Sequence, residues 1–128
     1  MIPSDCLYTK EHEWLKVEGD QATVGITDHA QSELGDIVYV ELPDVGDTFS
    51  SGEEFGSVES TKAVAEIFMP ITGEILEVNE ALDEGPDLVN TSPHQKGWLV
   101  KIRIEDESEL DDLMDAKAYQ AFVDQESA

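Results

Sequence analysis

Cysteine is almost missing from this sequence, since Cys6 is the only one among 128 residues. A single cysteine cannot form a disulfide within the chain, so the fold must depend on burial of apolar side chains. Hydrophobic residues make up 40% of the chain, and a chain of this length corresponds to one domain with a substantial core. The lack of disulfides favours a reducing compartment.

Long apolar runs are missing as well. No stretch reaches the roughly 18 apolar residues of a membrane-spanning helix. The first six residues lack the basic and apolar segments of a secretory signal, and they lack the Arg-rich pattern of a transit peptide. We therefore expect a soluble cytoplasmic protein that does not bind a membrane.

Basic residues are the third deficit. Seven Lys and Arg stand against 30 Asp and Glu, and the formal net charge is −23. Such a charge repels nucleic acids and anionic membranes, so we expect no nucleic-acid partner. The acidity is explained either by adaptation to high salt, where mobile ions screen self-repulsion, or by steering of a basic partner. The acids are spread along the whole chain rather than gathered in one block, so we favour salt adaptation.

Alternating apolar and polar residues predict a mainly β protein. Segments 13–18 and 21–26 flank the pair Gly19-Asp20, which predicts a hairpin. Thr27 to Leu34 are predicted to form a short helix, with Thr27 as its N-cap and Gly35 as its stop. The other predicted strands are 36–42, 53–59, 63–68, 73–78 and 98–104, and residues 83–97 are expected to form a loop.

The end of the chain has a helical period instead. Apolar residues stand at 110, 113 and 114 and again at 119, 122 and 123. Ser108 is the expected N-cap. This pattern predicts an amphipathic helix over 108–125, interrupted near Asp115, that covers one face or edge of the sheets.

A six-residue pattern occurs twice. Residues 35–40 and 73–78 share the order Gly, acid, Ile, aliphatic, any residue, Val. The repeat suggests two half-sandwiches related by a pseudo-twofold axis, and the predicted hairpin of residues 53–69 lies between the two copies. In such an arrangement the hairpin is expected at one end of the molecule, with its tip projecting.

Lys62 lies at that predicted tip and is the only Lys or Arg between Lys16 and Lys96, a window that holds 18 Asp and Glu. A lone lysine at a hairpin tip is ordinarily solvated or protects a strand edge from aggregation. Two features favour a function instead. The tip lacks the Asn-Gly or Asp-Gly pair of a plain two-residue hairpin, and the lysine is midway between the repeat copies. A projecting lysine suits a covalent acyl arm, because its amine must reach several enzymes.

The segment around this lysine resembles a known modification motif. Gly56-Ser57-Val58-Glu59-Ser60-Thr61-Lys62-Ala63 is similar to the lipoylation motif of the glycine-cleavage H-protein family. The resemblance covers nearly the whole chain, through the segments Tyr8 to Trp14, Gly25 to Gln31, Leu34 to Val38, Val40 to Pro43, Pro70 to Ile75, Leu88 to Asn90, Ser92-Pro93 and Gly97 to Leu99. The departures are Thr61 in place of the common Val, His94 in place of the common Tyr, and the excess of acid.

The resemblance implies a fold and a function. It implies a single lipoyl-carrier domain over residues 1–128, built as a lipoyl/biotinyl-type barrel-sandwich hybrid of two pseudo-symmetric halves with a helical cover at 108–125. It implies a monomeric carrier without catalytic residues, with lipoate attached to Lys62. The implied partners are glycine decarboxylase (P protein), aminomethyltransferase (T protein), dihydrolipoamide dehydrogenase (L protein) and a lipoate-attaching enzyme.

The resemblance also suggests further site residues. Glu59, Ser60 and Ala63 are candidates for recognition by the lipoate-attaching enzyme. Glu13, with His12 beside it, is a candidate wall of a groove that shelters the loaded arm, where its carboxylate would hold a cationic amine. We expect no metal site, because the pairs His12-Glu13 and Asp28-His29 lack a third ligand at a clear spacing.

Several alternatives compete with this function. Biotin carriers typically have Met on both sides of the lysine, and lipoyl domains of 2-oxoacid dehydrogenases usually have Asp before it; neither pattern is present here. A relay protein that donates lipoyl or octanoyl groups to other enzymes remains the nearest alternative. An unmodified acidic binding module is a third.

Overall fold

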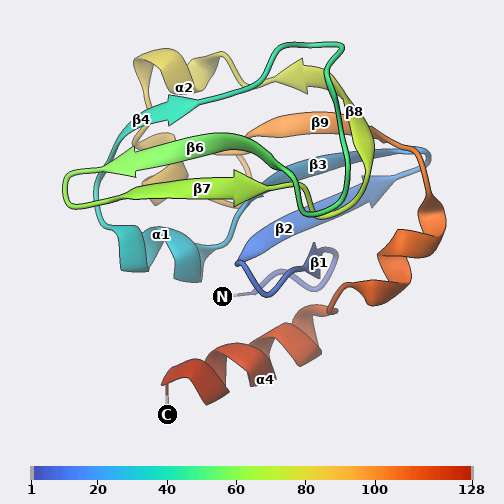
Figure 1. The fold of residues 1–128 in the computed structure, drawn as a ribbon. Helices are drawn as coiled ribbons and strands as arrows, with labels where there is room; N and C mark the ends of the chain where they lie inside the picture. The colour runs from blue at the N-terminus through green and yellow to red at the C-terminus, as the bar shows by residue number, and fades with distance from the viewer. Residues whose placement is uncertain (1, 128) are drawn as a thin grey trace.

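Two antiparallel sheets form the body of the protein in the computed structural model, which describes residues 2–127 (Figure 1). The strands are β1 (Leu7–Tyr8), β2 (Glu13–Glu18), β3 (Gln21–Ile26), β4 (Ile37–Glu41), β5 (Thr48–Phe49), β6 (Glu54–Ser60), β7 (Val64–Phe68), β8 (Gly73–Val78) and β9 (Val100–Ile104). The larger sheet has the order β1-β2-β3-β9-β8-β5, and the smaller has the order β4-β6-β7. The prediction of a mainly β fold is confirmed.

The core lies where the buried faces of both sheets meet. Val24, Ile75 and Ile102 of the larger sheet are fully buried in the same cluster as Val58 and Ile67 of the smaller one. On β9, for example, the buried residues Val100, Ile102 and Ile104 follow the two-residue period of a strand, which places alternate side chains on one face. Each such side chain contributes about 1.5–3 kcal/mol through its burial.

The predicted hairpins are confirmed. Strands β2 and β3 pair from Glu18↔Gln21 to Glu13↔Ile26 around Gly19-Asp20, with Gly19 at φ +67°. Strands β6 and β7 form the second hairpin, which projects at one end of the molecule (Figure 1). The repeated pattern of residues 35–40 and 73–78 falls on β4 and β8, one strand in each sheet, and the pseudo-twofold axis itself stays a prediction.

Helix α1 (Asp28–Leu34) agrees with its prediction at both ends. The Thr27 side chain accepts a hydrogen bond from the Ala30 N–H at 3.2 Å, as an N-cap does. Gly35 ends the helix at φ +87°, ψ −156°, a conformation open almost only to glycine.

The segment 83–97 differs from its prediction. Instead of a continuous loop, the chain forms two single-turn helices, α2 (Ala81–Glu84) and α3 (Leu88–Thr91), whose Leu82 and Val89 are buried in the core. Gly85 and Pro86 separate the two helical turns, and Pro93 and Gly97 follow the second one. Strands β1 and β5 were not predicted, because two residues are too few to show a period.

The C-terminal helical cover is interrupted as predicted, with different bounds. A 3₁₀ helix η1 (Glu107–Asp112) precedes α4 (Ala116–Ser127), and extended residues separate them. The first cap is Asp106 rather than Ser108, because the Asp106 carboxylate accepts a hydrogen bond from the Ser108 N–H at 3.0 Å. No helix among residues 2–127 is long and apolar enough to cross a membrane.

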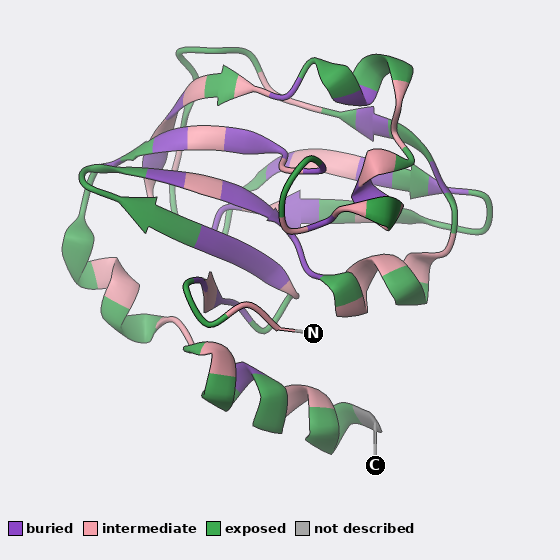
Figure 2. Ribbon diagram, turned by 180° about the vertical axis from the view of Figure 1, so that it is seen from behind, coloured by how far each residue is buried: buried purple, intermediate pink, exposed green. Residues whose placement is uncertain are grey.

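Helix α4 lies against the β1 edge of the larger sheet, and most of its length is exposed or half-buried (Figure 2). Its anchor is Tyr119, whose ring stacks on Tyr8 with centroids 4.6 Å apart. These two rings are buried with Trp14 and Cys6 in a second, smaller core cluster. Helix α4 is therefore held at the β1 edge of the larger sheet, and the wider role of residues 108–125 as a cover stays a prediction.

Candidate functional site

Lys62 lies at the tip of the β6–β7 hairpin, and its side chain is exposed. Its amine is not part of any ion pair within 4.0 Å in the described part of the chain. Both features matter, because burial or an ion pair would keep the amine from reacting. The amine is therefore accessible to a modifying enzyme.

The turn that presents Lys62 is organised by the Ser60 side chain. The Ser60 hydroxyl donates to the Ala63 carbonyl at 3.1 Å and accepts from the Lys62 and Ala63 N–H groups at 3.3 and 3.0 Å. The Ser60 N–H donates to the same carbonyl at 2.8 Å. Ser60 is buried, with 5% of its surface exposed, so its hydroxyl is used inside the turn.

The segment between α1 and β4 supports the tip from one side. The Thr61 N–H donates to the Asp36 carbonyl at 3.0 Å. A side chain built on Gly35 would place its Cβ 3.5 Å from the Cε of Lys62, so the lysine stem passes over this glycine. Contacts within the hairpin and with residues 35–36 therefore fix the position of the backbone from which the Lys62 side chain projects.

The other motif residues fall into two groups. Glu59 and Ala63 are exposed beside Lys62 and can be contacted directly by another protein, whereas Ser60 is not. Glu59 lies opposite Tyr39 on β4 and Val64 on β7. Tyr39 and Val64 are 56% and 64% exposed, which adds an apolar surface beside the lysine. The sequence does not predict this surface, because an apolar residue in a strand is usually part of the core.

Glu13, a predicted groove residue, is buried with 1% of its surface exposed. Its carboxylate accepts from the Thr9 hydroxyl at 2.8 Å and from the Phe68 N–H at 3.1 Å. Burial raises the pKa of Glu13 to about 7, against the lowering effect of these two hydrogen bonds. Both hydrogen-bond partners are neutral donors, so neither of them compensates the negative charge of the ionised carboxylate. Binding of a cation to this carboxylate would therefore be favourable.

A surface cavity of about 240 Å³ is lined by Thr9, the hydroxyl partner of Glu13, whereas the buried Glu13 does not itself line it. Its wall includes Thr9, which bonds Glu13, and Met69, which follows Phe68. Leu113 and Met114, from the segment before α4, line the same cavity and add apolar surface. The lining also includes the charged residues Lys10, Glu11 and Asp112, so the cavity is of mixed character.

His12, the other predicted groove residue, points elsewhere. It has φ +69°, which is uncommon for a residue with a side chain, and its Nδ1 lies 2.7 Å from the Tyr119 hydroxyl of α4. Its ring lies 4.6 Å from that of His29 on α1. The structure therefore does not bring His12 and Glu13 to one site, although they are neighbours in sequence.

A family model described as "Glycine cleavage H-protein" matches residues 6–126. A glycine cleavage system H protein from Staphylococcus haemolyticus is 52% identical over 122 residues, which cover 95% of this chain and 97% of the relative. A protein of the same name from an Anaeromyxobacter species is 54% identical over 125 residues, with 98% of each chain covered.

A solved structure shares the fold. The crystal structure of a glycine cleavage system H protein from Mycobacterium marinum aligns with a TM-score of 0.85 and 38% identity. The alignment covers 99% of this chain and 100% of that one, so the likeness extends to the C-terminal helix.

Proposed function

The chain belongs to the glycine cleavage H-protein family, whose members are lipoyl carriers of the glycine cleavage system, and we propose that Lys62 is the residue that carries the lipoyl group. The observation that supports this most directly is the exposed Lys62 amine on a turn fixed by Ser60. The fold is the lipoyl-domain barrel-sandwich, as the alignment with the solved relative shows.

The residues of the tip fit a covalent arm. The Lys62 side chain is exposed, and its stem passes close to Gly35, whose missing side chain leaves room. A lipoyl group held by Lys62 would supply a disulfide that can be reduced as it takes up an aminomethyl group, and a dithiol that can be oxidised back once that group has left. The chain itself supplies the tether, which replaces encounters in solution by a local search at each partner.

We propose that three enzymes meet this tip in turn: glycine decarboxylase, aminomethyltransferase and dihydrolipoamide dehydrogenase. The chain acts as a carrier, without a catalytic residue of its own. The exposed Tyr39 and Val64 support this role, because aromatic and apolar side chains concentrate binding energy at interfaces.

Glu13 is proposed to hold the amine of the loaded arm. Its support is the buried carboxylate with neutral donors and a nearby cavity lined by Thr9 and Met69, from which Glu13 would have to become accessible. A desolvated carboxylate attracts an ammonium group far more strongly than one in water. Exclusion of water at the same place would protect a labile aminomethyl group.

Glu59, Ser60 and Ala63 are proposed to direct the lipoate-attaching enzyme in two ways. The exposed Glu59 and Ala63 are available for direct contact. The buried Ser60 acts through the shape of the turn that presents the lysine.

Replacement of Lys62 by Arg tests the proposal. Lys62→Arg keeps the charge and the length of the side chain but cannot form the amide with lipoate. We expect glycine–bicarbonate exchange with the partner enzymes to vanish and the free energy of unfolding to change by less than about 0.5 kcal/mol, as is usual at exposed sites. Lys96→Arg is the matched control, because Lys96 is also exposed, and it should retain full exchange. Exchange by Lys62→Arg at the level of the control would refute the proposal.

A further inference from the structure

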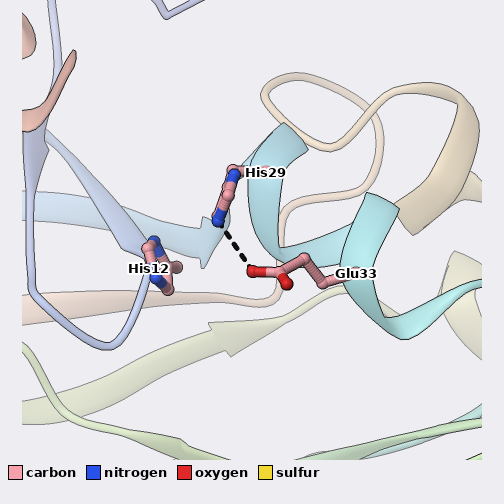
Figure 3. A group of neighbouring side chains, drawn as sticks. All are labelled: His12, His29 and Glu33. Atoms are coloured by element: carbon pink, nitrogen blue, oxygen red, sulfur yellow. Dashed lines mark ion pairs between the residues drawn. The ribbon is translucent and has the colours of Figure 1, made fainter. Parts of the chain in front are cut away.

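We propose that His12, His29, Glu33 and Glu126 form a binding site for one divalent transition-metal ion, with zinc as the best fit. The site is separate from the lipoyl attachment residue and does not depend on its modification. Figure 3 shows the His12, His29 and Glu33 side chains directed toward one another from the turn before β2 and from α1.

The ligand atoms are already close together. The Nε2 of His29 lies 2.7 Å from the Glu33 carboxylate, and one ligand atom from each of His12, His29 and Glu33 lies within 4.8 Å of the others. The Glu126 carboxylate of α4 lies 2.9 Å from the Nε2 of His12 and 3.9 Å from that of His29. Four-coordinate zinc at about 2.0–2.2 Å from each ligand needs them roughly 3.3–3.6 Å apart. The exposed side chains of Glu33 and Glu126 would have to rotate to bring all four ligands to that spacing.

The local fold explains why these ligands meet. His29 and Glu33 stand at i and i+4 of α1 and so lie on one face of the helix. The left-handed backbone of His12 turns its ring toward that face, whereas Glu13 points toward β7. The sequence predicts no metal site, because the pairs containing His12 and His29 have no third ligand at a clear spacing. The fold, in contrast, brings two carboxylates to these histidines, Glu33 from α1 and Glu126 from α4.

The outer contacts of His12 suit a metal ligand. A hydrogen-bonded chain runs from the His12 Nδ1 to the Tyr119 hydroxyl at 2.7 Å and on to the Thr27 hydroxyl at 2.8 Å. If the His12 Nδ1–H donates to the Tyr119 hydroxyl, the Nε2 of His12 has a free lone pair that can bind a metal ion. If the Tyr119 hydroxyl donates to Nδ1 instead, the proton of the ring is on Nε2, which can donate to Glu126. A metal ion replaces that proton, and the chain of hydroxyls fixes the ring orientation, as outer partners do in known metal sites.

The donor set selects the class of ion. Two imidazole nitrogens and two carboxylates match zinc and its neighbours in the first transition row, whereas magnesium and calcium prefer oxygen ligands alone. The two carboxylates balance the charge of a divalent ion. The overall charge of −23 also raises the local concentration of cations.

Occupancy would connect three separate parts of the chain. The ion would join the end of α4 to α1 and to the turn before β2. Because only the folded chain brings these ligands together, metal binding must raise the midpoint of thermal unfolding.

The test is zinc titration of the full chain after treatment with a chelator and removal of any affinity tag. We expect calorimetry to show one ion per chain, with a raised unfolding midpoint, and we expect cobalt to give the visible absorption of a four-coordinate site. His29→Gln and Glu33→Gln should each weaken zinc binding by at least about tenfold.

Two controls keep the result interpretable. Glu84→Gln removes an exposed carboxylate from α2 and should leave zinc affinity unchanged. Lys62→Arg should also bind zinc normally, so that failure of the lipoyl proposal and of this one can be told apart. Circular dichroism establishes that each variant is folded. The proposal is overturned if wild-type chain shows no saturable zinc binding below about 1 mM, or if His29→Gln binds as tightly as Glu84→Gln.

Discussion

Ser60 illustrates how one side chain can serve a motif without touching a partner. Its hydroxyl bonds both neighbouring N–H groups and one carbonyl of the tip. The motif in the sequence identifies Ser60 but does not predict these hydrogen bonds. Burial of a serine at a hairpin tip depends on how the surrounding backbone folds.

Ser60→Ala should therefore loosen the turn. Loss of the hydroxyl removes the acceptor of two N–H groups at an exposed tip, where water can partly replace it, and we expect a cost of about 0.5–1.5 kcal/mol in the free energy of unfolding. Ser57→Ala on the same strand is the control, since Ser57 is only half-buried. Urea unfolding of both variants measures the difference, and equal costs would contradict the role given to the hydroxyl.

Cys6 gives a prediction of reactivity. Burial raises the pKa of its thiol to about 11, and the neighbouring Asp5 adds to the shift. Because the thiolate is the reactive form, the folded protein should react slowly with iodoacetamide at pH 8, faster as the pH approaches 11, and rapidly at pH 8 once unfolded. Alkylation followed by mass measurement tests this, and equal rates for folded and unfolded chain at pH 8 would contradict it.

At the scale of elements, strong periodicity and capping signals predicted most of the fold. The β2–β3 and β6–β7 hairpins, β8 and α1 lie where their patterns indicated, since each has a local turn or cap signal. The elements missed were β1, β5, α2 and α3, each of two to four residues. Their formation depends on packing of residues such as Leu82 and Val89 in the core rather than on local pattern.

The attachment of α4 depends on Tyr119. Its ring stacks on Tyr8, and its hydroxyl lies 2.8 Å from that of Thr27 as well as beside His12. The amphipathic spacing of α4 predicted a packed helix. The hydrogen-bond partners of Tyr119 are more than 90 positions away in the sequence and could not be predicted from the local pattern.

Tyr119→Phe should cost about 1–3 kcal/mol of unfolding free energy, because it keeps the stacked ring but leaves buried polar groups without a partner. Tyr39→Phe removes a hydroxyl from a tyrosine that is 56% exposed, and it should change the stability by less than about 0.5 kcal/mol. Thermal and urea unfolding of the pair decide the matter: if the two variants are equally stable, the hydroxyl network does not hold the helix.

At the scale of the whole molecule, the acidic excess stays largely uncompensated. The ion pairs from lysine and arginine among residues 2–127 are those of Lys16, Lys101 and Arg103, each at the surface. Surface pairs contribute little, so repulsion among the acids must oppose folding at low salt.

The free energy of unfolding should therefore rise as salt is added. The Debye length falls from about 10 Å at 0.1 M to about 3 Å at 1 M, so most of the gain should be complete near 1 M. A series of urea unfolding curves in potassium chloride measures it. Stability that does not change with salt would argue against salt adaptation and would favour the alternative, in which the acids guide a basic partner.

The central claim concerns the covalent state of one amine, and mass spectrometry of the peptide that contains Lys62 tests it most directly. In protein isolated from a cell that makes lipoate, we expect this peptide to be heavier by one lipoate less one water, with the fragment ions placing the addition on Lys62. Unmodified Lys62 in such protein, or the same addition on Lys96 or Lys101 instead, would contradict the account.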